Sequence, residues 1–277
     1  EPLMQELGMA ELENSNYQTS LYWSMRDVPS SAGALALLPT AESSDEFGEF
    51  LFEDGVCPLV NNIICVDKDS NLQRYIATTT PVRAGVTGSV PLVGWDPKNN
   101  FDLATPEQLT VEKNPECGFS LTANNDTMED RGNFYVHNFP THGARADRIR
   151  QRLGEQQKFS VDDFCDMQLD LTDLRAREVL PDLLSVLKIS DDEDILLAVD
   201  LLESWDCRAS IDSAGACVYY PFLDRYWQRD YLFSVLEDDL IKLLPLAAPG
   251  LNRFDIKSFV KPGGPWKVHE EKLNEAI

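Results

Sequence analysis

Residues 58–83 read "PLVNNIICVDKDSNLQRYIATTTPVR", and this stretch decides the fold class. An apolar run ends at Val66, a polar D-x-D-S-N turn follows, and a second β-forming run begins at Leu72. Two β-forming runs joined by a short polar turn are typical of an antiparallel hairpin. We therefore expect a β-sheet to form around these residues.

The sequence before the hairpin predicts one strand and two helices. Residues 17–27, "YQTSLYWSMRD", are rich in aromatic and β-forming residues and indicate a strand. Residues 31–55 indicate a short helix, a break at Pro39, and a second helix that Ser43 or Ser44 caps.

The sequence after the hairpin begins with a loop, because residues 82–102 are punctuated by Gly and Pro, and "TPEQLT" then indicates a helical turn. The stretch "NPECGFSLTANND" at 114–126 predicts a turn followed by a strand over Phe119–Ala123. That strand ends at Asn124 and Asn125, although asparagine is depleted in strands and costly to bury without hydrogen-bond partners. The sequence thus raises the question of why a strand should end on two asparagines.

The character of the chain changes after residue 143, where helical periodicity replaces the β-forming runs. Ser160 is in the position of an N-cap and is followed by acidic residues, as the helix dipole favours. A long aromatic-rich pattern breaks near Pro221. The predicted helical stretches are residues 144–157, 160–188, 191–206, 214–245 and 269–277. We expect an α+β protein with a β-rich portion at 1–143 and a helical region at 144–277.

The composition argues against several classes of function. A chain of 277 residues, 43% of them hydrophobic, can bury a sizeable core. Its formal net charge of −23 argues against binding the phosphate backbone of a nucleic acid, which needs clustered Lys and Arg. No apolar run approaches the roughly 18 residues of a transmembrane helix, and the N-terminus lacks the pattern of a signal peptide. The acidic stretches indicate solvated helix faces, with a divalent-cation site or a saline habitat as alternatives.

The common metal and nucleophile motifs are missing from the sequence. The six cysteines have no C-x-x-C spacing and no histidine at ligand spacing, which argues against a structural zinc site. Cys207 and Cys217 bracket a turn and could form a disulfide, or could remain free thiols. There is no G-x-S-x-G motif and no P-loop, and His137, His142 and His269 suggest no catalytic triad.

An ordered series of small motifs carries more information than any one of them. In chain order the motifs are "SLYW", the hairpin stretch, "VPLVGWD", "NPECGFSLTANN", "GARADRI", "LDLTDLRAREVLPDLL" and "LLESWD". Over residues 18–230, this series resembles the large (β) subunit of the penicillin acylase family. These proteins are heterodimeric amidases of the N-terminal-nucleophile (Ntn) hydrolase superfamily. One departure is Ser70-Asn71-Leu72, where the family commonly has Gly-Asn-Ile.

The resemblance implies part of an Ntn-hydrolase αββα sandwich with an appended helical region. It also implies a mechanism in which an N-terminal Ser attacks the amide and its own α-amino group is the general base, so that no histidine is needed. This chain begins with Glu1 and both of its ends look cut, so we expect a companion chain or segment to supply the Ser. The resemblance implies that no cofactor is required and that the protein is periplasmic or secreted. It leaves open whether a calcium ion binds near "DTMEDRGNFY" (126–135).

The resemblance also implies roles for two site residues. The side-chain amide of Asn124 points into the oxyanion hole, where N–H donors about 3 Å from the developing negative oxygen stabilise it. Arg145, which opens the helix "RADRI", holds Asn124 through hydrogen bonds. Without the resemblance, Asn124 is interpreted as a strand cap and Arg145 as a surface cation. The supporting residues are Asn62 and Asp67 at the turn and strand ends, Asn125 as a structural neighbour of the site, and Trp95 and Trp205 as core anchors.

Two functions from different classes remain open at this point. The first is hydrolysis of an N-acyl amide, such as a penicillin antibiotic, an acyl-homoserine lactone or an acylated peptide, with this chain supplying the oxyanion hole. The second is a catalytically inactive acylase-fold subunit that serves as a structural or interaction component of a larger complex. A companion segment that begins with Ser after a processing site favours the first, and its absence favours the second.

Overall fold

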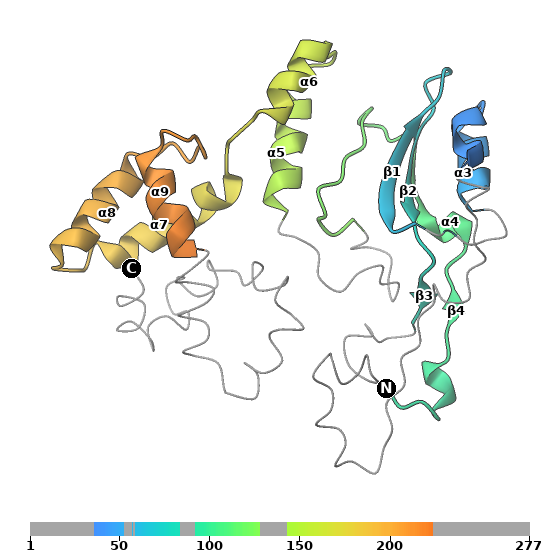
Figure 1. The fold of residues 1–277 in the computed structure, drawn as a ribbon, viewed down its shortest axis with the longest axis horizontal. Helices are drawn as coiled ribbons and strands as arrows, with labels where there is room; N and C mark the ends of the chain where they lie inside the picture. The colour runs from blue at the N-terminus through green and yellow to red at the C-terminus, as the bar shows by residue number, and fades with distance from the viewer. Residues whose placement is uncertain (1–35, 53–56, 58, 84–91, 128–142, 224–277) are drawn as a thin grey trace. The chain divides into compact units, whose positions relative to one another are not determined.

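The computed structural model describes residues 36–52, 57, 59–83, 92–127 and 143–223. The chain divides into two compact units, Glu1–Pro140 and Thr141–Ile277 (Figure 1). Each unit has its own cluster of buried hydrophobic side chains. The strands in the described residues all belong to the first unit, and the regular structure of residues 143–223 is helical apart from an isolated bridge between Thr172 and Arg208.

The predicted hairpin is confirmed. Strand β1, Asn61–Val66, pairs antiparallel with strand β2, Leu72–Ala77, so that the first residue of β1 lies opposite the last residue of β2. On its other side β2 pairs antiparallel with strand β5, Thr110–Lys113. The larger of the described sheets therefore has the order β1-β2-β5 with β2 in the centre. Figure 1 shows β1 and β2 side by side.

Helix α3, Ser44–Leu51, packs against the hairpin, and its N-cap is Ser43, one of the two caps predicted. The Ser43 hydroxyl accepts a hydrogen bond from the backbone N–H of Glu46 at 3.1 Å, which satisfies one of the free donors of the first turn. The predicted break at Pro39 falls in a short 3-10 helix, η3, Leu38–Thr40. The core beneath α3 consists of Leu51, Phe52, Cys57, Tyr75, Ile76, Ala77, Ala104 and Leu109.

The predicted Gly- and Pro-rich loop contains short elements. Strand β3, Pro81–Val82, pairs with strand β4, Asp102–Leu103, and a 3-10 helix, η5, covers Pro97–Asn99. The predicted helical turn is confirmed as α4, Pro106–Leu109, which a capping box at Thr105 begins and which leads directly into β5.

The strand predicted over Phe119–Ala123 is wrong. The segment that pairs with β2 is β5, earlier in the chain, and Asn114 ends it. The backbone N–H of Asn114 donates to the Leu72 carbonyl and its side-chain oxygen accepts from the Leu72 N–H, each at 2.8 Å. A turn with Gly118 at φ +76° follows, so residues 119–123 leave the β2 ladder.

The second unit is built from helices α5, Ala144–Leu153, α6, Val161–Gln168, α7, Leu174–Leu187, α8, Glu193–Glu203, and α9, Ala214–Pro221. The predicted N-cap Ser160 is confirmed by a capping box with Asp163. The stretch 160–188 forms two helices because Asp173 caps a new helix by accepting from the Ala176 N–H at 2.9 Å.

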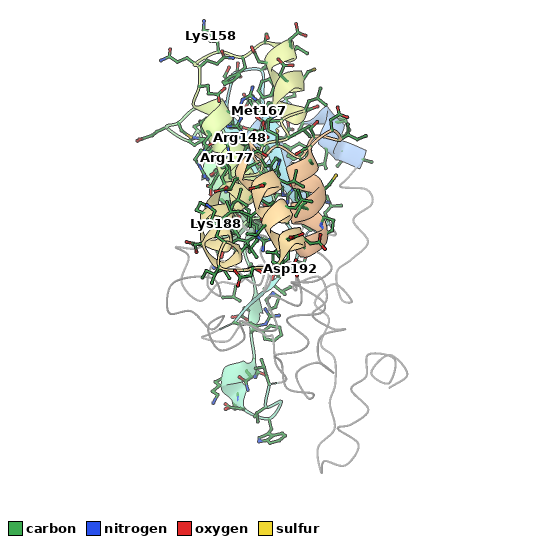
Figure 2. All side chains as sticks on the ribbon, turned by 90° about the vertical axis from the view of Figure 1, so that its left-hand side faces the viewer. Arg148, Lys158, Met167, Arg177, Lys188 and Asp192 are labelled. Carbon is green, nitrogen blue, oxygen red and sulfur yellow. The ribbon has the colours of Figure 1, made fainter. Side chains whose placement is uncertain are left out.

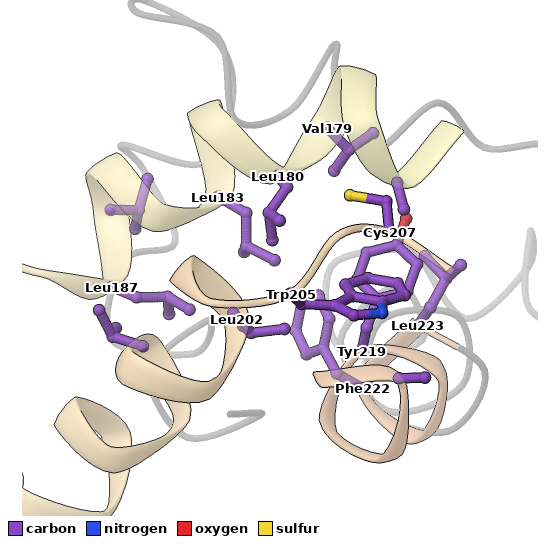
Figure 3. Close-up of a cluster of buried hydrophobic side chains, with 14 of the residues drawn as sticks. Val179, Leu180, Leu183, Leu187, Leu202, Trp205, Cys207, Tyr219, Phe222 and Leu223 are labelled. Carbon is purple, nitrogen blue, oxygen red and sulfur yellow. The ribbon is translucent and has the colours of Figure 1, made fainter. Parts of the chain in front are cut away.

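The core of the second unit lies between α7, α8 and α9 (Figure 3). Trp205 is 8% exposed and packs against Tyr219, with ring centroids 5.2 Å apart, so its predicted core role is confirmed. The same prediction is wrong for Trp95, which is 72% exposed. Trp95 lies inside a turn that the Asp96 N–H closes by donating to the Val93 carbonyl, and this turn carries the indole out toward solvent.

Several predictions fall outside the described residues. These are the strand at 17–27, the helix at 269–277, the continuation of the 214–245 pattern beyond residue 223, and His137, His142 and His269. Within the described part of the chain, no helix combines the length and apolar character needed to cross a membrane.

Candidate active site

Asn124 lies in a tight bend and has a left-handed backbone conformation, φ +62°. Asparagine is one of the few residues other than glycine that adopt this conformation readily. Its neighbour Asn125 holds the bend, because its side-chain oxygen accepts from the Ala123 N–H at 3.1 Å and its amide donates to the Asp126 carbonyl at 3.0 Å. Asn125 thus has the structural role predicted for it, and the side chain of Asn124 is exposed.

The segment that leads to Asn124 is attached to the sheet by a side-chain contact. The Ser120 hydroxyl donates to Oε2 of Glu112 on β5, and the same oxygen accepts from Nε of Arg74 on β2 at 3.1 Å. Burial opposes ionisation of Glu112, but the hydrogen bonds from Arg74 and Ser120 hold its pKa below the usual value. These residues were not predicted from the sequence. A usable signal was the arginine inside an apolar strand, since Arg is rarely buried unless paired.

Asp67 stabilises the turn between β1 and β2, as predicted. Its carboxylate accepts from the backbone N–H groups of Asp69 and Asn71, at 3.0 and 2.8 Å, and from the Asn71 side chain at 2.9 Å. These hydrogen bonds, above all the one from the Asn71 side chain, hold the pKa of Asp67 well below its usual range. Ser70, where the family resemblance leads one to expect glycine, has φ +68°. Asn62 lies exposed near the start of β1, opposite Ile76.

Arg145 is the second residue of α5 and is exposed. Helix α5 is held by Arg148, labelled in Figure 2, and Arg152, which donate to Oδ2 of Asp170 at 2.5 and 2.8 Å. Asp170 lies between α6 and α7, and its side chain is 5% exposed. Arg145 belongs to the second unit and Asn124 to the first.

The described residues contain no group of three or more His, Cys, Asp or Glu side chains that could hold a metal ion. Most of the stretch 126–135, where calcium was left open, lies outside them. All six cysteines are free thiols, so Cys207 and Cys217 are not bridged. Cys207 is buried, which raises the pKa of its thiol, and Cys217 is exposed.

A family model, a curated protein and a solved structure each match most of this chain. The model of the family described as "Penicillin amidase" matches residues 2–269. The chain is 26% identical over 198 residues to the penicillin acylase 2 proenzyme of Pseudomonas sp. (strain SE83), a match that covers 69% of this chain and 25% of that protein. A thermostable penicillin G acylase from Alcaligenes faecalis has a similar fold, with a TM-score of 0.59 at 17% identity.

The structural match covers 89% of this chain and 50% of the Alcaligenes chain. The chain therefore spans about a quarter of the length of the curated relative and about half of that of the solved one. The fold similarity confirms the predicted α+β class, and the family match confirms the resemblance seen in the ordered motifs. The chain belongs to the penicillin amidase family of the Ntn hydrolases.

Proposed function

We propose that this chain forms part of an N-acyl amide hydrolase and that Asn124 contributes its side-chain N–H to the oxyanion hole. Attack on an amide carbonyl produces a tetrahedral intermediate with a negative oxygen, which preorganised N–H donors stabilise. The observation that carries the proposal is the bend at 123–125. It combines a left-handed Asn124 with an exposed side chain and an Asn125 that bonds the backbone on both sides. Such an arrangement fixes the backbone on both sides of Asn124, and so fixes the point from which its side chain extends.

The reacting group in this proposal is an N-terminal Ser from a companion chain or segment, with its α-amino group as the general base. Support comes from the Pseudomonas relative, which is named a proenzyme and of which this chain spans 25%. Substrates are N-acyl amides such as a penicillin, an acyl-homoserine lactone or an acylated peptide. The reaction needs no organic cofactor, and we place the enzyme in the periplasm or outside the cell.

For Arg145 we retain the role that the family resemblance implies, that of a residue that supports the oxyanion site and does not itself react. Support comes from its place at the start of α5, a helix that Arg148 and Arg152 fasten to Asp170. A guanidinium has several donors in a rigid plane, so it can hold a side-chain amide in one orientation.

The test compares three variants of the complete enzyme that carries this chain. Asn124→Gly removes the amide while retaining the left-handed backbone, and Asn124→Asp keeps the size but loses the donors. We expect kcat to fall about 10²- to 10³-fold in both variants, the usual effect of losing one oxyanion-hole donor. Ser70→Gly is the control, because it replaces another left-handed residue of the same unit and should leave kcat unchanged.

A kcat within about twofold of the parent in Asn124→Gly contradicts the oxyanion role. The alternative function, a catalytically inactive structural subunit, is tested on the parent protein. Mass spectrometry of the native assembly, with N-terminal sequencing of each chain, should find a companion that begins with Ser. An assembly without such a chain, and without amidase activity on a panel of N-acyl amides, favours the structural role.

A further inference from the structure

Arg74 is a charged residue in the centre of the described sheet. It lies on β2 between the two other strands and is 3% exposed. Its Nε donates to Glu112 on β5, and Glu112 also accepts the hydroxyl of Ser120, which lies four residues before Asn124. The three side chains therefore join two strands to the segment that ends in the candidate oxyanion residue.

This contact is poorly explained by stability alone. Burying an arginine is costly, and a buried ion pair seldom repays that cost in full. Here Nη1 of Arg74 is also buried and has no hydrogen-bond partner among the residues that the structure describes. A hydrogen bond to an ionised acceptor is, however, short and directional, so the pair fixes the position of whatever Glu112 holds. Glu112 holds Ser120.

We propose that Ser120 and Glu112 are positioning residues that determine where the Asn124 amide lies, and that Arg74 holds Glu112 in place. The inference rests on the proposed oxyanion role of Asn124. Residues 119–123 have left the β2 ladder, so the ladder does not position them. The Ser120 hydroxyl attaches this segment to β5 on one side of Asn124, and the Asn125 side chain holds the bend on the other.

The first test is kinetic and uses the complete enzyme. Ser120→Ala removes the hydroxyl but leaves the Arg74–Glu112 pair intact. A misplacement of a catalytic donor by about 1 Å can cost about 10²-fold, so we expect kcat to fall between about tenfold and 10²-fold. KM should change by less than about twofold, because the lost interaction acts in the transition state. Ser120→Thr retains the hydroxyl and should restore most of kcat.

A second variant separates positioning from general loosening of the sheet. Lys113 follows Glu112 on β5, but it pairs with Asp45 of α3 at 2.7 Å and thus faces the helix-covered side of the sheet. Lys113→Ala removes an ion pair from the same strand and should leave kcat unchanged. An equal loss of kcat in Lys113→Ala and Ser120→Ala overturns the inference, because it shows that any disturbance of β5 is sufficient.

The decisive measurement is a double-mutant cycle with Asn124→Gly. If Ser120 acts through the Asn124 amide, Ser120→Ala should have almost no further effect on kcat once that amide is absent. Multiplying losses in the double variant overturn the inference, as does an unchanged kcat in Ser120→Ala alone. The single Asn124→Gly variant distinguishes the oxyanion role of Asn124 from the positioning role of Ser120. Parental kcat in that variant refutes the oxyanion role itself, whereas a reduced kcat there with a fully active Ser120→Ala refutes only the positioning role.

Discussion

The carboxylate of Asp67 accepts hydrogen bonds from both the backbone N–H and the hydroxyl of Ser44, at 3.1 and 3.2 Å. Ser44 is 1% exposed and begins α3, whereas Asp67 begins the turn between β1 and β2. Gln73 donates to the Ser44 hydroxyl at 3.0 Å, and Tyr75 donates to the Ser44 carbonyl at 2.5 Å. A polar network therefore joins the helix to the hairpin.

Removing the Asp67 carboxylate should make stability less dependent on pH. Its pKa is lower in the folded state than in the unfolded chain, so its stabilising effect is present above about pH 5 and is lost as the pH falls. Asp67→Ala should therefore melt below the parent at neutral pH, and the difference between the two melting temperatures should begin to narrow near about pH 4 and go on narrowing at every lower pH where the proteins still fold. Thermal unfolding followed by circular dichroism measures this. A difference that stays constant with pH contradicts the prediction, and Asp69→Ala in the same turn is the control.

Replacing Ser70 by glycine should stabilise the protein. Ser70 has φ +68°, where a side chain costs roughly 1–2 kcal/mol and glycine has no such cost. Glycine loses more entropy on folding, which offsets part of the gain, so we expect the free energy of unfolding to rise by about 0.5–1 kcal/mol. Urea unfolding of Ser70→Gly beside Asp69→Gly checks this, because Asp69 is not among the residues with positive φ and its substitution should destabilise. A urea midpoint for Ser70→Gly below that of the parent contradicts the predicted stabilisation.

Asp170→Asn should weaken the attachment of α5. The carboxylate accepts from Arg148, Arg152 and the Thr172 N–H, and these bonds outweigh burial and keep its pKa low. An amide cannot accept all of them, so we expect a loss of about 1.5–3 kcal/mol of unfolding free energy. Asp147→Asn is a matched control on α5, since its pair with Arg150 is exposed and worth less than about 1 kcal/mol. Equal effects of the two substitutions in denaturant titrations are incompatible with this assignment.

Gly215→Ala should destabilise the second unit. A Cβ atom at this position lies 2.4 Å from Cβ and 2.5 Å from Cγ of Trp205, so either the indole or α9 must move. Overpacking of this kind typically costs about 1–3 kcal/mol. Gly154→Ala is the comparison, because its new Cβ meets only carbonyl oxygens at 3.4 Å and φ is −83°. Calorimetry should show a lower melting temperature for Gly215→Ala and almost none of that loss for Gly154→Ala.

Features encoded by neighbouring residues could be predicted from the sequence. Ser160 was predicted as a cap, and Ser43 as one of two alternatives with Ser44, because a cap bonds a backbone N–H within its own first turn. The hairpin was predicted because its two strands and turn are contiguous. The family and the candidate role of Asn124 came from the order of the motifs, which periodicity alone does not supply.

Features that depend on distant residues could not be predicted. The run Phe119–Ala123 has the composition of a strand, but Thr110–Lys113 pairs with the free edge of β2 instead. Trp95 and Trp205 are the same residue type, and only their surroundings decide which is buried. Arg74 and Glu112 are 38 positions apart, so neither residue reveals its partner to a local pattern.

The same difference in sequence distance has a consequence for the order of folding. In the described part of the second unit α7 contacts α8 and α8 contacts α9, which are neighbours in the chain, and the contact of α5 with α7 passes over α6 alone. In the first unit the pairing of β2 with β5 closes a long loop, which carries an entropic cost before any contact repays it. We expect the helices to acquire protection from hydrogen exchange early in refolding and β5 to acquire it late. The Ser120 contact requires β5 to be docked, so the candidate site should mature only when the sheet is complete.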